Sequence, residues 1–475
     1  MLARKIALNS LISTAVRVAG IGVSLATIGF ITRYFSKTQW GEYSIVLAFG
    51  GIFAVLADLG LYQMMVREIS RDEVSEGKII NNIFTLRLFS SLFIFALAPF
   101  LSFFLPYSDL TRWGIALGMV GFWFLTDIQV LIGIFQKYLR MDKVALAEFL
   151  GKIVQLLIVI WFIKLGLGFL WIILTIILGA LINFLVIWRL LAGHAKLRLD
   201  FDFSFWKEIW RKSYPLAISN ILTMIYFSAN AIIISVFWPA EEVGVFRLSY
   251  KVLESLIFFP AMFVGLMMPL LSRFALADWT KFKNIFQRTF DVLMIFGWPL
   301  ILGGVALAPQ IICLLGGDQY QESVGILRIL MMAVGLIFLG TLFSFGLIAL
   351  ERQRTLLKIS AVGVAANLIL NFALIPRYSS LAAAWVSVLT EMLVLGLMFW
   401  VFWRAWRLFP SFSVGAKSFL AALIMASLVW RFNQLNLLFL LLGGALIYFL
   451  VLGLLRGISW RELNELLIKQ ERADS

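Results

Sequence analysis

The chain has 475 residues, of which 62% are hydrophobic and 14% charged, against about 25% charged in an average soluble domain. A water-soluble protein of this size could not bury so much apolar surface, so the composition predicts an integral membrane protein. One cysteine and one histidine exclude a disulfide framework and a Cys/His metal site, and we expect no cofactor. The net charge of +14 is explained by basic cytoplasmic loops, so nucleic acid is not expected as a partner.

Long continuous apolar runs, rather than alternating ones, predict membrane-spanning helices and an all-α polytopic fold. They give about fourteen transmembrane helices joined by short loops, of which the longest, 189–212, follows the sixth span. The predicted spans are 10–32, 43–66, 81–104, 113–135, 144–163, 169–188, 213–238, 244–271, 289–314, 323–349, 359–375, 381–403, 418–432 and 437–455.

The basic residues orient these spans. Most of the 40 Lys and Arg residues fall on one side when the N-terminus is placed in the cytoplasm, and such an excess marks cytoplasmic loops. An even number of spans then returns the C-terminus to the same side. The sequence predicts a multi-pass protein of the cytoplasmic (inner) membrane with both termini cytoplasmic.

The two halves of the chain resemble each other. Residues 31–43 align with 234–246 at an offset of 203, with Gly41 matching Gly244, and later pairs match at an offset of 214. The paired segments are six spans apart, so the halves have the same topology and form a parallel repeat.

This repeat predicts two six-helix lobes followed by a helix pair. The expected boundaries are 1–192 for the N-lobe (spans one to six), 193–212 for a cytoplasmic linker, 213–408 for the C-lobe (spans seven to twelve), and 409–475 for spans thirteen and fourteen with a cytoplasmic tail. Two lobes related in this way normally bind substrate in a cavity at their interface.

Several short segments resemble one family. Residues 33–43 (RYFSKTQWGEY) and 58–61 (DLGL), with the turns at 136–141 (QKYLRM) and 350–354 (LERQR), are similar to the Wzx-type oligosaccharide flippases. These polysaccharide export proteins belong to the MOP (multidrug/oligosaccharidyl-lipid/polysaccharide), or MATE-like, superfamily. The likeness extends over the whole chain.

The resemblance implies a pair of lobes whose central hydrophilic cavity opens alternately to each side of the membrane. It implies a flippase that moves undecaprenyl-diphosphate-linked oligosaccharide, a polysaccharide repeat unit, from the cytoplasmic to the periplasmic leaflet. The expected partners are this lipid-linked substrate and membrane lipids, with the polysaccharide polymerase machinery as a further candidate.

Polar side chains at helical spacing suggest where the cavity lies. Arg17 and Ser24 share one face of span one, and Asn220 and Asn230 occupy the matching face of span seven. A charge in the bilayer centre costs at least ~2.5–3.5 kcal/mol and therefore marks a functional site by default. Arg17 is accordingly the strongest candidate for lining the cavity. The alternative is that these groups only join helices, with Arg17 paired to Asp58.

A second basic cluster falls on span eight, where Arg247, Lys251 and Glu254 follow one another at i, i+4 and i+7. An arginine fork and a lysine point charge would suit a diphosphate or acidic sugars. The alternative is local, with Glu254 neutralising Lys251 and Arg247 reaching the interface.

The remaining intramembrane carboxylates could serve as coupling or pairing groups. Asp58, Asp127 and Glu391 are the main candidates, together with Glu254, although no set of oxygen ligands for a metal can be recognised. Arg87 is expected only to orient the end of its helix.

Two other functions were weighed against the flippase. A cation-coupled multidrug antiporter of the same superfamily should have an acidic cavity, whereas spans one, seven and eight carry three basic residues and one Glu. A membrane enzyme such as a polymerase or ligase would need a large periplasmic loop with acid and base residues. Every predicted periplasmic loop is short, so we do not expect an enzyme.

Overall fold

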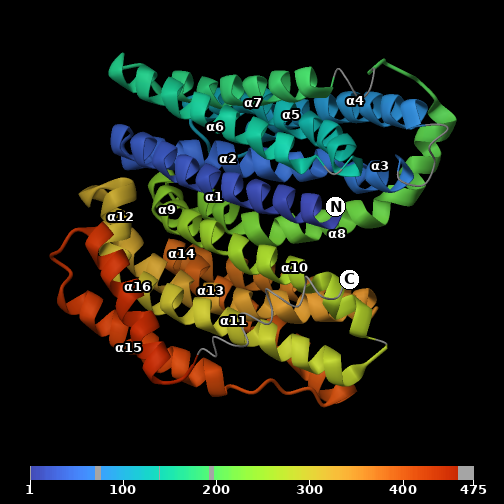
Figure 1. Cartoon of the computed structure of the whole chain (residues 1–475). Coiled ribbons are helices and arrows are strands. Elements are labelled where there is room, and N and C mark those ends of the chain that lie inside the picture. Colours follow the sequence, from blue (N-terminus) through green and yellow to red (C-terminus); the bar gives the residue numbers. More distant parts are fainter. Residues whose placement is uncertain (1, 70–75, 139, 192–196, 276, 458–475) are drawn as a thin grey trace. The chain divides into compact units, whose positions relative to one another are not determined.

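The computed structural model describes residues 2–69, 76–138, 140–191, 197–275 and 277–457, and Figure 1 shows their arrangement as helices. The side chains of residues 2–12 and of 215, 216, 219, 223 and 225–227 lie outside this description. In the described part, the regular elements are all helical, as the sequence predicts. They are α1 (Leu2–Tyr34), α2 (Lys37–Asp58), α3 (Leu61–Ile69), α4 (Glu76–Ser102), α5 (Asp109–Lys137), α6 (Met141–Lys164), α7 (Phe169–Leu191), α8 (Phe203–Phe237), α9 (Ala240–Leu256), α10 (Phe258–Ala275), α11 (Trp279–Ala306), α12 (Ala308–Gly316), the 3-10 helix η1 (Asp318–Tyr320), α13 (Gln321–Ala349), α14 (Gln353–Trp406), α15 (Ser413–Arg431) and α16 (Leu437–Leu454).

The described residues contain twelve helices long and apolar enough to cross a membrane. One of them, α14, has 54 residues and would be about 80 Å long, far more than the ~30 Å hydrocarbon core. Its backbone is non-helical at Ser379 (φ 52°, ψ −139°), between the two spans predicted for this region. The protein is a multi-pass membrane protein, while the count of fourteen spans stays a prediction.

The chain forms two compact units. Unit 1 contains residues 1–247, 315–319 and 371–380, and unit 2 contains 248–314, 320–370 and 381–475. The predicted lobe boundaries, which rest on the repeat, are not tested by this division. Part of the predicted linker, 192–196, and the tail, 458–475, lie outside the described residues, as does Met1.

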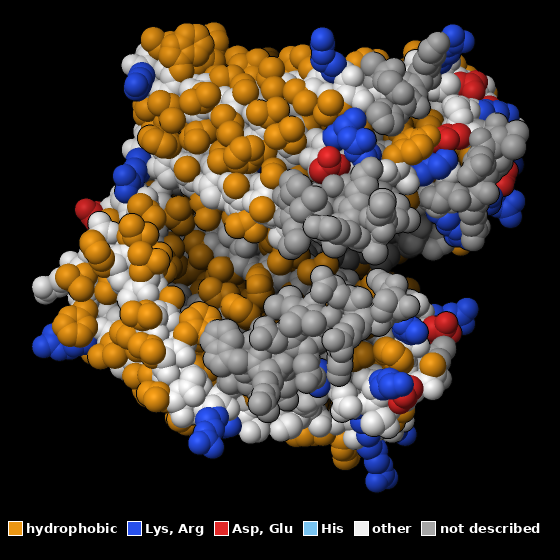
Figure 2. All heavy atoms as spheres, in the orientation of Figure 1, with side chains coloured by type: hydrophobic (Ala, Val, Ile, Leu, Met, Phe, Trp, Pro, Cys, Tyr) orange, Lys and Arg blue, Asp and Glu red, His pale blue; other side chains and the backbone are white. Residues whose placement is uncertain are grey.

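Unit 1 is a helix bundle in which α5 packs against α2, α4 and α7, and α6 packs against α1 and α7. In Figure 1, α4, α5, α6 and α7 lie together at the top. The visible outer face of this bundle is mostly hydrophobic, with charged side chains gathered towards the end where α3 and α4 are labelled (Figure 2). This pattern is expected of helices that meet lipid along their length and water at their ends.

Within unit 1 the helix ends reproduce the sequence repeat. Helix α1 ends at Tyr34 and α2 begins at Lys37, and both positions recur in α8 and α9 at Phe237 and Ala240 after the same offset of 203. The ends of α2 and α9 also touch, because the Trp40 indole N–H donates to the Gly244 carbonyl oxygen at 3.0 Å.

Gly41 makes this close approach possible. A Cβ atom at this position would lie 1.7 Å from the Ala240 carbonyl oxygen, which no side chain could tolerate. Thr38 and Glu241, again 203 residues apart, are hydrogen-bonded at 2.7 Å. Repeat-equivalent residues therefore face one another at this end of unit 1.

The segment before α8 is fastened to α4 by side chains. Asn82, which is fully buried, donates to the Asp200 carboxylate at 2.7 Å and accepts from the Asp202 backbone N–H at 2.9 Å. The Asp202 carboxylate caps α8 by accepting from the Phe205 N–H at 3.0 Å, and it pairs with the Lys78 ammonium at 2.8 Å. These bonds fix the position from which α8 enters the bundle.

Unit 2 packs α11 against α10, α13 and α15, and α15 against α16. Aromatic rings fill its interior around Phe286, whose ring centroid lies 5.4 Å from that of Phe343 and 5.5 Å from that of Phe402. A second buried cluster, which includes Met425 and Tyr448, joins α11, α15 and α16.

Candidate functional site

A polar cavity of about 520 Å³ lies inside unit 1, among helices predicted to cross the membrane. Its walls come from α1, α2, α3, α5, α6 and α8, so it opens among segments far apart in sequence. The residues that line it are Arg17, Ala54, Val55, Asp58, Tyr62, Gln63, Gln129, Ile132, Met141, Glu148, Asn220 and Met224.

Asp58 is placed in this cavity by the end of α2. The chain turns sharply after it, with Leu59 (φ 50°) and Gly60 (φ 70°) in the left-handed region, where glycine is tolerated without a steric penalty. Helix α3 then starts in a new direction at Leu61. The turn leaves the carboxylate and the last carbonyl groups of α2 exposed to side chains from other helices.

Arg87 occupies that position. Its Nη1 donates to the Asp58 carboxylate Oδ1 at 2.5 Å and to the Asp58 carbonyl oxygen at 2.7 Å. Arg87 therefore neutralises the charge of Asp58 and also caps the C-terminus of α2. Its Nη2 donates to the Thr126 carbonyl oxygen at 3.3 Å and to Gln129 Oε1 at 3.1 Å. The Arg87 side chain is fully buried, and Asp58 pairs with its charge within the protein, while its Nε has no hydrogen-bond partner among the described residues.

Asn220 connects α8 to the same carboxylate. Its amide donates to Asp58 Oδ2 at 3.3 Å and to Gln63 Oε1 at 3.5 Å. Asp58 thus has both oxygens engaged, by a cation and by an amide. A carboxylate held in this way is not free to neutralise a further cation in the cavity.

Arg17 is the second arginine at this site, and it does not share the Asp58 ion pair. It lines the cavity from α1 and is half-buried. Its Nε is buried, yet no hydrogen-bond partner for that atom exists among the described residues. Since Asp58 pairs with Arg87, the alternative pairing of Arg17 with Asp58 is not formed. Arg17 therefore lines the cavity without an ion pair among the described residues.

The cavity also holds an acid and several neutral hydrogen-bonding groups. Glu148 lines it from α6, about 10 Å from the start of that helix, and Arg87 lies about 16 Å from the start of α4. The Tyr62 hydroxyl donates to Gln136 Oε1 at 2.5 Å at the rim. Glu148 and Arg87 therefore both lie in the half of the membrane nearer the helix ends that are predicted to be cytoplasmic.

Two other predicted cavity residues lie elsewhere in unit 1. The Ser24 hydroxyl donates to the Gly20 carbonyl oxygen of its own helix at 2.9 Å. Asn230 is buried and its Oδ1 accepts from the Asn371 amide at 2.7 Å. Neither residue lines the polar cavity. The Ser24 bond stays within α1, and the Asn230 bond joins α8 to α14.

The carboxylates are divided among separate places. Asp127 is buried and accepts from the Ser91 hydroxyl at 2.9 Å, and Glu391 is buried in α14. On α9 the Lys251 ammonium contacts Glu254 at 2.9 Å, which is the local pairing given above as the alternative to a diphosphate site. Arg247 is half-buried on the same helix. None of these residues lines the polar cavity.

Sequence reasoning missed most of the cavity's polar lining. Arg87 was expected only at the end of its helix, although an arginine within an apolar span is itself a signal for a buried acid. Tyr62, Gln63 and Gln129 carry no charge and no motif, and Glu148 lies four residues before Lys152, a spacing that favours a local pair on one helix. Only the packing of helices brings these residues together.

With this geometry in view, the comparisons identify the family. A family model described as "Polysaccharide biosynthesis protein" matches residues 30–325, which is more than half of the chain. The chain belongs to this family. Two curated relatives of this chain are the probable flippase AglR of Haloferax volcanii, 25% identical over 224 residues, and the capsular polysaccharide biosynthesis protein CapF of Staphylococcus aureus, 23% identical over 201 residues.

These two alignments cover 46% and 42% of the chain, and the chain spans only about half the length of each relative, 46% and 51%. Solved structures extend the likeness. The lipid II flippase MurJ, in an inward closed conformation, has a TM-score of 0.75 at 14% identity, over 95% of this chain and 99% of that one. A multidrug resistance MATE family transporter of the MOP superfamily, in an inward-facing conformation, has a TM-score of 0.63 at 14% identity, over 84% and 98%.

The chain therefore has the same fold as these two membrane proteins, as the sequence resemblance predicts. The expectation of an all-helical membrane fold is confirmed, while the parallel repeat of two six-helix lobes stays a prediction. At 14% identity the structural likeness establishes the fold alone.

Proposed function

We propose that this protein is a flippase that moves undecaprenyl-diphosphate-linked oligosaccharide from the cytoplasmic to the periplasmic leaflet by alternating access. The observation that carries the proposal is Arg17, a cation that lines a polar cavity within the membrane region and has no ion pair among the described residues. A charge in that position is costly unless a ligand meets it. An anionic group passing through the membrane would be such a ligand.

The cavity offers two kinds of recognition. The Arg17 guanidinium can donate to phosphate oxygens with charge-assisted hydrogen bonds. Gln63, Gln129 and Asn220 present amides, and Glu148 presents acceptor oxygens, all suited to sugar hydroxyls. A substrate that carries a phosphate beside hydroxyl-rich sugars uses both.

The ion pair beside the cavity supports this role. Arg87 and Asn220 engage both oxygens of Asp58, so that carboxylate does not compete with the substrate for Arg17. We regard Arg87 as a positioning residue that keeps Arg17 available.

The remaining assignments belong to the same proposal. Ser24, Asn230, Arg247 and Lys251 are retained as residues that meet the substrate in other states of the transport cycle, and Asp127, Glu254 and Glu391 as coupling or pairing carboxylates. The lobes are 1–192 and 213–408, joined by 193–212 and followed by 409–475. The protein lies in the inner membrane with both termini cytoplasmic, transports without chemical conversion, and delivers its product to polysaccharide polymerase machinery.

The test is transfer in reconstituted liposomes. Wild-type protein is given undecaprenyl-diphosphate-linked oligosaccharide, and the accessibility of the glycan from outside is followed over time. Arg17→Gln should fold normally and lose at least about tenfold in rate, the equivalent of one charge-assisted hydrogen bond. Arg33→Gln, a change of the same type at the other end of α1, is the matched control and should transfer at the wild-type rate.

The outcomes separate the parts of the proposal. Equal transfer by wild type and Arg17→Gln would retain the flippase and remove Arg17 from its path. No transfer by folded wild type with several glycans would contradict the flippase itself.

A second candidate, a cation-coupled multidrug antiporter, is favoured by one observation. Glu148 places a carboxylate in the cavity, and an organic cation would need such a group. Uptake of a fluorescent organic cation that depends on Glu148 and is unaffected by Arg17→Gln would favour the antiporter over the flippase.

A further inference from the structure

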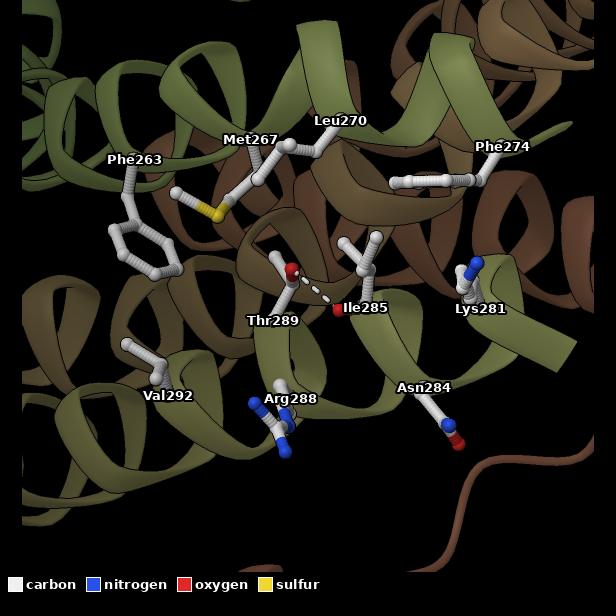
Figure 3. Close-up of a pocket in the computed structure, with 10 residues that line it drawn as sticks. All are labelled: Phe263, Met267, Leu270, Phe274, Lys281, Asn284, Ile285, Arg288, Thr289 and Val292. Atoms are coloured by element: carbon white, nitrogen blue, oxygen red, sulfur yellow. Dashed lines mark hydrogen bonds between the residues drawn. The ribbon is translucent and has the colours of Figure 1, made fainter. Parts of the chain in front are cut away.

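A second concave site lies in unit 2, between α10 and α11, far along the chain from the polar cavity. It is a groove of about 360 Å³, shown in Figure 3. On α10 its wall is formed by Phe263, Met267, Leu270 and Phe274, which recur at i, i+4, i+7 and i+11 and so form one continuous apolar stripe. Ile285 and Val292 extend the apolar lining on α11.

The groove has the length of one membrane leaflet. From Phe263 to Phe274 the α10 stripe rises about 17 Å, and half of the hydrocarbon core is about 15 Å thick. Its outer end lies where α10 ends at Ala275 and α11 begins at Trp279, a loop predicted to be cytoplasmic. An extended hydrocarbon chain entering from that leaflet would fit along it.

Two cations line this groove, Lys281 near its outer end and Arg288 about 10 Å further along α11. Lys281 and Arg288 both line it and both are exposed. The Lys281 ammonium lies 5.4 Å from the centre of the Phe274 ring and 3.2 Å from the Asp278 carboxylate, so its charge is partly balanced. The Arg273 guanidinium lies 5.5 Å from the same ring.

Arg288, unlike Lys281, has no carboxylate in an ion pair with it among the described residues. It lies about 14 Å along α11 from Trp279, inside a candidate membrane span, and no ion pair of Arg288 is found among the described residues. Figure 3 shows its side chain turned away from the four α10 side chains, towards the same side of α11 as Asn284. Arginine side chains on a helix incline towards its N-terminus, here towards the leaflet surface.

We propose that this groove binds an anionic phospholipid of the leaflet predicted to be cytoplasmic. One acyl chain lies along the α10 stripe, and the phosphate accepts hydrogen bonds from Arg288, with Lys281 adding positive charge. Charge complementarity selects an anionic headgroup, because a zwitterionic one would bring its own cation next to Arg288. Basic pockets between transmembrane helices on this side of a membrane are suited to such headgroups. The inference is independent of the transport proposed above.

Binding is measured with the purified full-length protein in detergent, from its thermal unfolding during titration with phosphatidylglycerol. Phosphatidylcholine with the same acyl chains tests the charge of the headgroup, and glycerol phosphate tests the headgroup without chains. Undecaprenyl phosphate tests whether the groove instead takes the carrier lipid of the transport path.

We expect phosphatidylglycerol to raise the unfolding temperature of the wild type while phosphatidylcholine does not. Arg288→Gln should weaken phosphatidylglycerol binding about tenfold or more, because one charge-assisted hydrogen-bonding partner is lost. Leu270→Trp, which fills the groove, should weaken it similarly. Arg404→Gln, an exposed arginine of unit 2 that does not line the groove, is the matched control and should bind as the wild type does.

Each variant's unfolding without added lipid reports whether it folds. The proposal is overturned if the two phospholipids act equally, if glycerol phosphate alone reproduces the effect, or if folded Arg288→Gln binds phosphatidylglycerol as tightly as the wild type. It is also overturned if only undecaprenyl phosphate acts through Arg288, because the groove would then belong to the carrier lipid.

Discussion

The polar cavity of unit 1 and the groove of unit 2 differ in whether a nearby arginine has an ion-pair partner within the protein. Beside the cavity, Arg87 is fully buried, and its two terminal nitrogens donate to Asp58, Thr126 and Gln129. In the groove, Arg288 is exposed on a membrane-spanning helix and has no ion pair among the described residues. Both arginines lie within candidate membrane-spanning helices.

The difference shows that sequence position alone does not reveal the role of an intramembrane charge. A buried ion pair contributes to the fold because removing one member leaves the other uncompensated. An unpaired arginine contributes little to folding and is instead available to a ligand. Arg17 resembles Arg288 in this respect, although it lines the same cavity as the carboxylates of Asp58 and Glu148.

Breaking the internal pair should have the largest effect. Replacing Arg87 by Met should destabilise the protein by about 3–5 kcal/mol, because Asp58 is left charged and buried without its cation. The double variant Arg87→Met, Asp58→Asn should recover much of this loss. Chemical unfolding in detergent measures both. Equal stability of the single and the double variant would contradict the idea that an uncompensated carboxylate causes the loss.

A smaller effect is expected at Asn220. Asn220→Ala removes the amide that donates to Asp58 and Gln63, which should cost about 0.5–1.5 kcal/mol in the same unfolding measurement. Asn284→Ala, an exposed asparagine beside the groove, serves as the control and should unfold like the wild type. If both variants behave alike, the bridge from α8 to Asp58 does not stabilise unit 1.

At Arg288 the expected change in stability is close to zero. In detergent without added anionic lipid, Arg288→Ala should alter the free energy of unfolding by no more than roughly 0.5 kcal/mol, as for other exposed positions. Comparison with Arg87→Met in one experiment tests the contrast directly. A loss similar to that of Arg87→Met would show that Arg288 has a structural partner within the protein.

A different kind of effect, one that depends on pH, is expected from a charge outside the membrane spans. Hydrogen bonds from Lys78, Ser204 and the Phe205 N–H hold the pKa of Asp202 well below its usual range. A lowered folded-state pKa gives stability that is present above the ordinary aspartate value of about 3.9 and is lost as the pH falls through the folded value.

Asp202→Asn retains the helix cap and removes the charge. Wild type should therefore be slightly more stable than the variant at pH 7, and the two unfolding curves should converge in acid. A difference that persists unchanged to low pH would mean that the carboxylate charge is not its source.

Much of the architecture could be predicted from the sequence. Continuous apolar runs specify helices long enough to cross the membrane, because backbone groups in lipid must be hydrogen-bonded within the helix. The offset of 203 predicted matching helix ends, which α1, α2, α8 and α9 confirm. For the same reason Gly41 and Gly244 could be recognised as equivalent before they were seen to lie together.

The candidate site was only partly predictable. Arg17, Asp58 and Asn220 stand out in sequence because polar groups are rare and costly in such helices, and all three line the cavity. Ser24 and Asn230 stand out equally but bond to other helical groups. Helical periodicity places a residue on a face without saying which neighbour that face meets.

What the sequence determined by itself was the class of fold, its repeat and the set of charges that need an explanation, since these follow from local composition and spacing. The tertiary structure alone decided which charge pairs with which. Asp58 lies 29 residues from Arg87 and 162 from Asn220, and a turn through Leu59 and Gly60 decides that they meet. Pairing depends on distances between helices, and those distances are fixed only when the helices pack.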